Sequence, residues 1–155
     1  EVAAALCRKL GMRSCKELRE AKYIYCEPIY CQPNYGNKGL IWRNKGLTAA
    51  DLTKLGTLGS VLPALQSLEL YLGQPVQGLV EGLGAGALPA LTTLNLQMHV
   101  GDAGASALAA ALGRGALPRL MTLSLANGAI GDAGLVALAP ALRRRPALVG
   151  LFLMG

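Results

Sequence analysis

The chain has 155 residues, 52% of them hydrophobic, and a formal net charge of +6. This length is enough for one domain with a hydrophobic core, and because Gly, Pro, Asp, Asn or Gln interrupts every apolar run before 18 residues, the sequence argues against a transmembrane helix. The charge is uneven: residues 1–45 hold nine Lys and Arg against four Asp and Glu, whereas residues 46–155 hold six against five.

Residues 1–37 form a basic segment, rich in cysteine and tyrosine, that is not repeat-like. Residues 3–19 have apolar side chains near helical spacing, which predicts an amphipathic helix weakened by Gly11. Residues 23–26 then alternate, and turn-forming residues follow up to Gly36. We expect this segment to cap the repeats that follow or to act as a docking arm for a partner. Its candidate protein-binding residues are Tyr23, Tyr25 and Tyr30.

The charge of this segment suits an acidic protein surface, anionic lipid or nucleic acid, because charge alone does not choose among them. Its Lys and Arg are interleaved with Glu17, Glu20 and Glu27, and no nucleic-acid-binding motif accompanies them. We therefore expect an acidic protein surface, and not nucleic acid, as the partner of this segment. The other interpretation is a solvated face that keeps the protein soluble.

The four cysteines of the chain all lie in this segment, at Cys7, Cys15, Cys26 and Cys31. Intervals of 7, 10 and 4 residues between them fit no zinc module built from two close pairs. Reduced thiols are expected in a protein of the cytosolic type, whereas an oxidising compartment would permit two disulfides. No metal site and no cofactor is predicted.

A repeat begins near residue 38 and continues to the end of the chain. The pattern Pro-x-Leu-x-x-Leu-x-Leu starts at Pro63, Pro89, Pro118 and Pro146, which are 26, 29 and 28 residues apart. Self-similarity at this period predicts one strand–turn–helix unit stacked on copies of itself, with the leucines of each short strand pointing inward. The predicted repeats are residues 38–62, 63–88, 89–117 and 118–145, followed by a partial repeat at 146–155.

The turn and helix of each repeat also carry a pattern. Gly-Asp-Ala-Gly occurs at residues 101–104 and 131–134, ahead of predicted helices near 104–112 and 134–143. Asp102 and Asp132 are placed to cap the free N–H groups of these helices. Gly82, Gly84 and Gly86 predict a shorter or irregular helix in the repeat of residues 63–88, which contains them.

These motifs together resemble the ribonuclease-inhibitor-like class of leucine-rich repeats over residues 38–155. The resemblance implies an α/β solenoid with parallel strands on its concave side and helices on its convex side, preceded by a helical or irregular N-terminal segment. It also implies an intracellular location and protein recognition, and it implies no reaction. The asparagine expected after each strand is present as Asn44 and Asn127, but Leu72 and Met98 occupy the matching places.

The sequence predicts no enzyme. His99 stands alone beside a glycine turn, and no catalytic motif or phosphate-binding loop is present. The function we expect is a protein-binding module or scaffold, or an accessory subunit of a larger assembly, with a partner that the sequence does not name. The alternative is a regulatory protein, such as a GTPase activator, that acts through the repeat surface.

The residues that alternate with the inward leucines are predicted to line the concave face. Arg and aromatic residues dominate the energetics of protein interfaces, so they are preferred among these positions. The candidate binding residues of this face are Arg43, Glu69, Tyr71, Asn95, Gln97 and Phe152.

The sequence stops one strand into a repeat, at Leu151-Phe152-Leu153-Met154-Gly155. A repeat that lacks its turn and helix leaves the apolar side of the preceding repeat open unless something else covers it. We expect a partner or further chain to cover it, and to bury Leu135, Leu142, Leu151 and Leu153.

Overall fold

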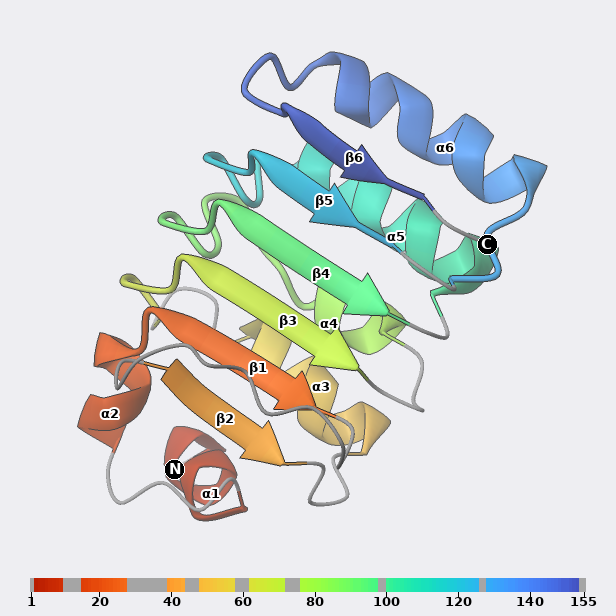
Figure 1. The fold of residues 1–155 in the computed structure, drawn as a ribbon. Coiled ribbons are helices and arrows are strands. Elements are labelled where there is room, and N and C mark those ends of the chain that lie inside the picture. Colours follow the sequence, from red (N-terminus) through yellow and green to blue (C-terminus); the bar gives the residue numbers. More distant parts are fainter. Residues whose placement is uncertain are drawn as a thin grey trace.

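The protein has an α/β fold built on one parallel sheet. The computed structural model describes residues 2–9, 15–27, 39–43, 48–57, 62–71, 76–97, 100–125 and 128–153. The strands are β1 (Tyr23–Glu27), β2 (Gly39–Arg43), β3 (Ser67–Tyr71), β4 (Thr93–Gln97), β5 (Thr122–Ser124) and β6 (Gly150–Phe152). The helices are α1 (Val2–Lys9), α2 (Cys15–Glu20), α3 (Ala49–Thr57), α4 (Gln77–Glu81), α5 (Gly101–Gly113) and α6 (Asp132–Arg143). These strands form a six-stranded sheet in the order β2-β1-β3-β4-β5-β6, with every pair parallel (Figure 1).

The four strands expected after the repeated prolines are confirmed, and the inward direction of the leucines is confirmed for β3, β4 and β5. Leu68, Leu94 and Leu123 are register partners in adjacent strands, and each is almost completely buried. In β4, buried and partly exposed residues alternate along the strand. The leucines therefore form a continuous core between the sheet and the helices, as the period of two in a strand requires.

Helices α3 to α6 cover one face of the sheet (Figure 1), and small residues let neighbouring helices approach closely. A β-carbon placed on Gly56 of α3 would meet the backbone of Leu79 in α4, and one placed on Gly134 of α6 would lie 3.1 Å from the β-carbon of Ala105 in α5. The short helix expected in the repeat of residues 63–88 is confirmed, because α4 has only five residues. Pro140 lies inside α6, near its C-terminal end.

Main-chain hydrogen bonds join β1, β3, β4, β5 and β6 in turn at the residues where each strand begins. The carbonyl oxygen of Gln66 accepts the N–H groups of Thr92 and Thr93, at 2.8 and 3.1 Å. The same double contact recurs at the carbonyls of Lys22, Gln66, Thr92 and Met121. We call this series the main-chain ladder. Because backbone groups make it, this link between neighbouring strands requires no particular side chain at the carbonyl positions.

The N-terminal segment contributes a strand to the same sheet. β1 pairs with β2 on one side and with β3 on the other, and the Lys22 carbonyl begins the main-chain ladder. The predicted repeat of residues 38–62 comes immediately before the repeat of Glu69 in the sequence, but β1 lies between their strands, β2 and β3, in the sheet. The helix expected over residues 3–19 is described as two helices, α1 and α2, with residues 10–14 outside the described part of the chain.

The role expected for Asp102 is corrected by the structure. Asp102 does not cap its own helix; its Oδ1 accepts the N–H groups of Gly131 at 2.7 Å and Gly134 at 3.1 Å, at the start of the next helix, α6. A side chain at Gly134 would lie 2.6 Å from this oxygen, so the glycine permits the approach. Asp132 makes no capping bond to its own helix. The aspartate of the Gly-Asp-Ala-Gly motif at residues 101–104 thus binds the start of the next helix along the sheet.

Replacing Asp102 by alanine should lower the free energy of unfolding by about 1 to 2 kcal/mol, because two N–H groups at the helix start lose their acceptor. Urea denaturation monitored by circular dichroism measures this change. Asp102→Asn keeps an acceptor oxygen in place and should recover most of the loss. Equal destabilisation by both substitutions would contradict the cap.

Among the described residues, no helix is both long and apolar enough to cross a membrane.

Candidate functional site

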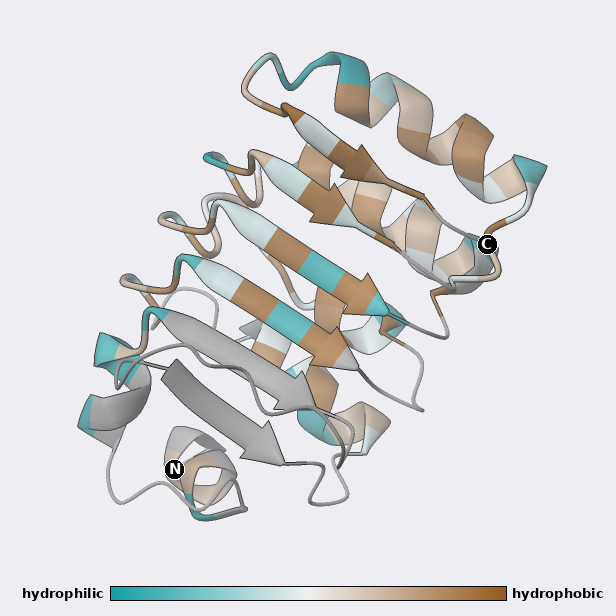
Figure 2. Ribbon diagram, in the orientation of Figure 1, coloured by the Kyte–Doolittle hydropathy of each residue, from teal (hydrophilic) through white to brown (hydrophobic). Residues whose placement is uncertain are grey.

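The face of the sheet opposite helices α3 to α6 carries the side chains that alternate with the buried leucines. We call it the open face. Register partners place Glu69 beside Asn95, Asn95 beside Ser124, and Ser124 beside Phe152. Ser67, Thr93 and Thr122 form a second row in the same three strands, β3 to β5. Figure 2 shows hydrophilic and hydrophobic bands alternating along β3 and β4, whereas β6 is mainly hydrophobic.

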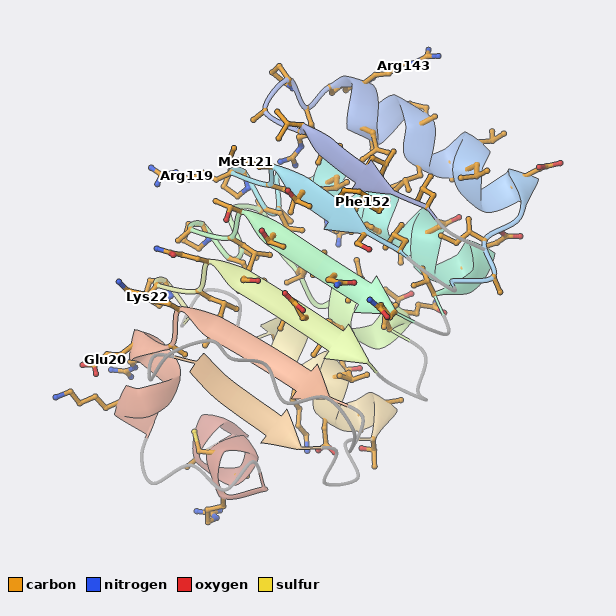
Figure 3. The ribbon with its side chains drawn as sticks, viewed as in Figure 1. Glu20, Lys22, Arg119, Met121, Arg143 and Phe152 are labelled. Atoms are coloured by element: carbon orange, nitrogen blue, oxygen red, sulfur yellow. The ribbon has the colours of Figure 1, made fainter. Side chains whose placement is uncertain are left out.

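The chemistry of the open face changes from strand to strand across the sheet. Its centre presents hydroxyl and amide groups with the carboxylate of Glu69, and its β6 end presents Phe152, which is 54% exposed (Figure 3). This combination of polar groups and an exposed ring suits a protein surface, since aromatic side chains supply most of the energy of such contacts.

Asn95 occupies the middle of the open face. Within the described part of the chain, its Oδ1 atom is buried and has no hydrogen-bond partner. A buried acceptor without a donor costs about 1–3 kcal/mol, so Asn95 is an unsatisfied polar group in the middle of this face.

The structure brings most of the predicted binding residues onto one sheet. Glu69, Asn95, Gln97 and Phe152 belong to the open face, and Tyr71 is the register partner of Gln97. The backbone positions of Tyr23, Tyr25 and Arg43 lie in β1 and β2, with Tyr25 next to Glu69. Tyr30 lies outside the described residues.

Sequence reasoning missed that the β1 positions join this surface. The signal was present: Ala21, Ile24 and Cys26 have the spacing of Leu65, Leu68 and Leu70. Ala21 is buried as Leu65 is, so the residues before β1 follow the pattern of a repeat with smaller side chains. The positions of the open face consequently extend across one strand, β1, that the repeat pattern did not include.

The residues considered for metal binding or catalysis do not form a reactive cluster in the described part of the chain. No group of three or more His, Cys, Asp or Glu there could hold a metal ion. Cys7 is buried in the core, while Cys31 and His99 lie outside the described residues, as do Asn44, Asn127, Leu72 and Met98. Neither a protein-family model nor a curated protein matches this chain.

Proposed function

We propose that the chain is a non-catalytic protein-binding module of the leucine-rich-repeat type, which binds its partner on the open face. Stacked strand–helix units, leucines in register and the main-chain ladder support the repeat class. In such a stack, the helices leave one face of the sheet free along its whole length, which offers an extended surface for a folded partner.

The observation that carries this proposal is the row from Glu69 through Asn95 and Ser124 to Phe152. These residues come from four strands that are far apart in sequence, and the sheet register sets them side by side. The row pairs a carboxylate and a buried amide acceptor at one end with an exposed aromatic ring at the other. It therefore fits a partner that presents a cation or N–H donors next to an apolar side chain.

Capture of the partner from the native source with the intact chain, followed by titration of the purified pair, tests the proposal. Glu69→Lys and Phe152→Ala should each weaken the complex by about tenfold or more, because the first sets like charges against each other and the second removes an exposed aromatic ring, a residue type that contributes strongly to interfaces. Glu81→Lys is the matched control: Glu81 is exposed and belongs to α4, on the covered side of the sheet.

Unchanged affinity of both open-face variants would contradict binding at this surface. A captured small GTPase whose binding depends on its nucleotide would favour the regulatory alternative, whereas a stoichiometric partner without nucleotide dependence would favour a scaffold or an accessory subunit.

A further inference from the structure

The segments that lead from α5 into β5 and from α6 into β6 concentrate positive charge. We call residues 114–121 and 143–149 together the arginine patch. They contain all five basic residues that the sequence has after Lys54, and each of the five is an arginine. The four acidic residues after Lys54 all lie outside the patch, at Glu69, Glu81, Asp102 and Asp132. The two signs of charge are therefore segregated, whereas an ordinary solvated surface mixes them.

Hydrogen bonds join the two segments of the arginine patch into one surface. Arg145, in the second segment, donates to the carbonyls of Leu117 and Ala116 in the first, each at 2.7 Å. The N–H of Val149 donates to the carbonyl of Met121 at 2.8 Å. The patch consequently lies at the edge of the sheet where β5 and β6 begin.

Three of the five arginines have no bonding partner in the described part of the chain. Arg145 and Arg114 are engaged, because their guanidinium groups donate to carbonyls of the preceding unit. Arg119, Arg143 and Arg144 are exposed and make no hydrogen bond or ion pair with the described residues. The dipole of α6 favours positive charge at its C-terminal end, which suits two of these three. It does not account for Arg119, which lies in the turn before β5.

Met121 adds an exposed apolar side chain to the patch. The residues at the same place before β3 and β4 are polar, at Gln66 and Thr92. Met121 is 43% exposed even though its strand lies between β4 and β6, so this exposure does not arise from a place in the last unit. Its neighbour Val149 is exposed as well. Figure 3 shows Arg119 projecting outward from the turn that precedes Met121.

This combination of residue types favours a protein ligand. Arginine and methionine are enriched in protein interfaces, whereas lysine is depleted. A guanidinium binds a carboxylate through two parallel hydrogen bonds and is more weakly hydrated than an ammonium group. The patch contains no aromatic residue on which a nucleic-acid base could stack. Its two exposed apolar side chains would give only shallow insertion into a lipid surface.

We propose that the arginine patch binds an acidic segment of a partner protein, in which Asp or Glu residues flank an apolar side chain. The carboxylates pair with Arg119 and Arg144, and the apolar side chain packs on Met121. This role goes beyond the proposed function, because no residue of the patch belongs to the row that carries binding on the open face.

A labelled peptide with glutamates on both sides of a central leucine, titrated with the intact chain at low ionic strength, tests this proposal by fluorescence anisotropy. Arg119→Glu should raise the dissociation constant by about tenfold or more, because attraction becomes repulsion. Arg8→Glu is the matched control. It makes the same change of charge at an exposed residue of α1, a helix that contacts α2 and α3, and should change the dissociation constant by less than about twofold.

A double-mutant cycle tests the contact of Met121. Met121→Ser should weaken peptide binding by about three- to tenfold, because apolar burial is lost. Replacing the leucine of the peptide by serine should cause a similar loss with the unmodified chain, but little further loss with Met121→Ser. Thermal denaturation checks that each variant is folded.

Several results would overturn the proposal: no binding of the peptide, additive losses in the cycle, or an equal effect of Arg8→Glu. Tighter binding of single-stranded RNA or of phosphatidylserine vesicles than of the peptide would also overturn it. Glu69 and Phe152 are unchanged in every variant, so failure here would leave binding at the open face to its own test.

Discussion

Replacing Arg145 by alanine is expected to lower the free energy of unfolding by about 3 kcal/mol, because one guanidinium holds three carbonyl groups of the preceding unit. Its Nη1 donates to the Leu117 carbonyl at 2.7 Å, and its Nη2 donates to the carbonyls of Leu112 and Ala116 at 2.8 and 2.7 Å. Leu112 lies in the last turn of α5, and the other two follow that helix. Arg145 thus caps the C-terminal end of α5 from the next unit.

The size of this effect follows from charge and burial together. Hydrogen bonds to a charged group contribute about 1.5–3 kcal/mol, and carbonyls at a helix C-terminus carry the negative end of its dipole. Arg145 is partly buried, so after its removal water can hydrogen-bond to the three carbonyls only in part. Arg145→Lys retains the charge but loses the planar array of donors, and should recover less than half of the loss.

Arg144→Ala is the matched control for this prediction. Arg144 is adjacent in sequence and exposed, so its removal should change stability by less than about 0.5 kcal/mol. Chemical denaturation of the three variants at equal protein concentration gives the comparison. Similar stability of the Arg144 and Arg145 alanine variants would show that the three carbonyl contacts do not hold the last two units together.

A second large loss of stability is expected for Gly56→Ala, of about 2 to 3 kcal/mol. In an ordinary helix this substitution stabilises by roughly 1 kcal/mol, since alanine restricts the unfolded chain. At Gly56 the added β-carbon would run into the carbonyl group of Leu79, which belongs to the backbone of α4 and cannot rotate away. Helices α3 and α4 would have to separate, which opens the core beneath them.

Gly113→Ala provides the control, because it is also a helix glycine but has nothing within 4 Å of an added β-carbon. We expect it to be neutral or stabilising by up to about 1 kcal/mol. The two substitutions are chemically identical, so opposite signs in thermal or urea denaturation would isolate the close approach of the helices. Destabilisation by both, to the same extent, would contradict this explanation.

The sequence alone was sufficient for those parts of the fold that depend on local pattern. Inward leucines at a spacing of two, such as Leu94 and Leu96, predict a buried strand whatever its neighbours are, and the structure confirms it. The run of glycines after α4 likewise predicted its shortness. The α/β arrangement with a parallel sheet follows from these elements, whereas the leucine-rich-repeat class and the binding function are proposals.

Contacts between units could not be predicted in this way. Asp102 and Arg145 bind backbone atoms about one repeat away, so their partners depend on how the units stack and not on the residues around them. The place of β1 between β2 and β3 was missed because Ile24 and Cys26 replace leucines and the strand order departs from chain order. The binding residues were identified from strand alternation, but their neighbours across the sheet required the register.

The main-chain ladder has a consequence for how this protein tolerates sequence change. The residues that provide its carbonyls have basic, amide, hydroxyl and thioether side chains, at Lys22, Gln66, Thr92 and Met121. The ladder uses only backbone atoms, and Thr92 adds one side-chain bond, from its hydroxyl to the Gln66 carbonyl at 3.2 Å. Almost any residue except proline should therefore be accepted at Lys22, Gln66 and Met121 without loss of folding. Their side chains line one rim, so this rim is a suitable place to diversify by randomised libraries, where new specificities could be selected with little effect on stability.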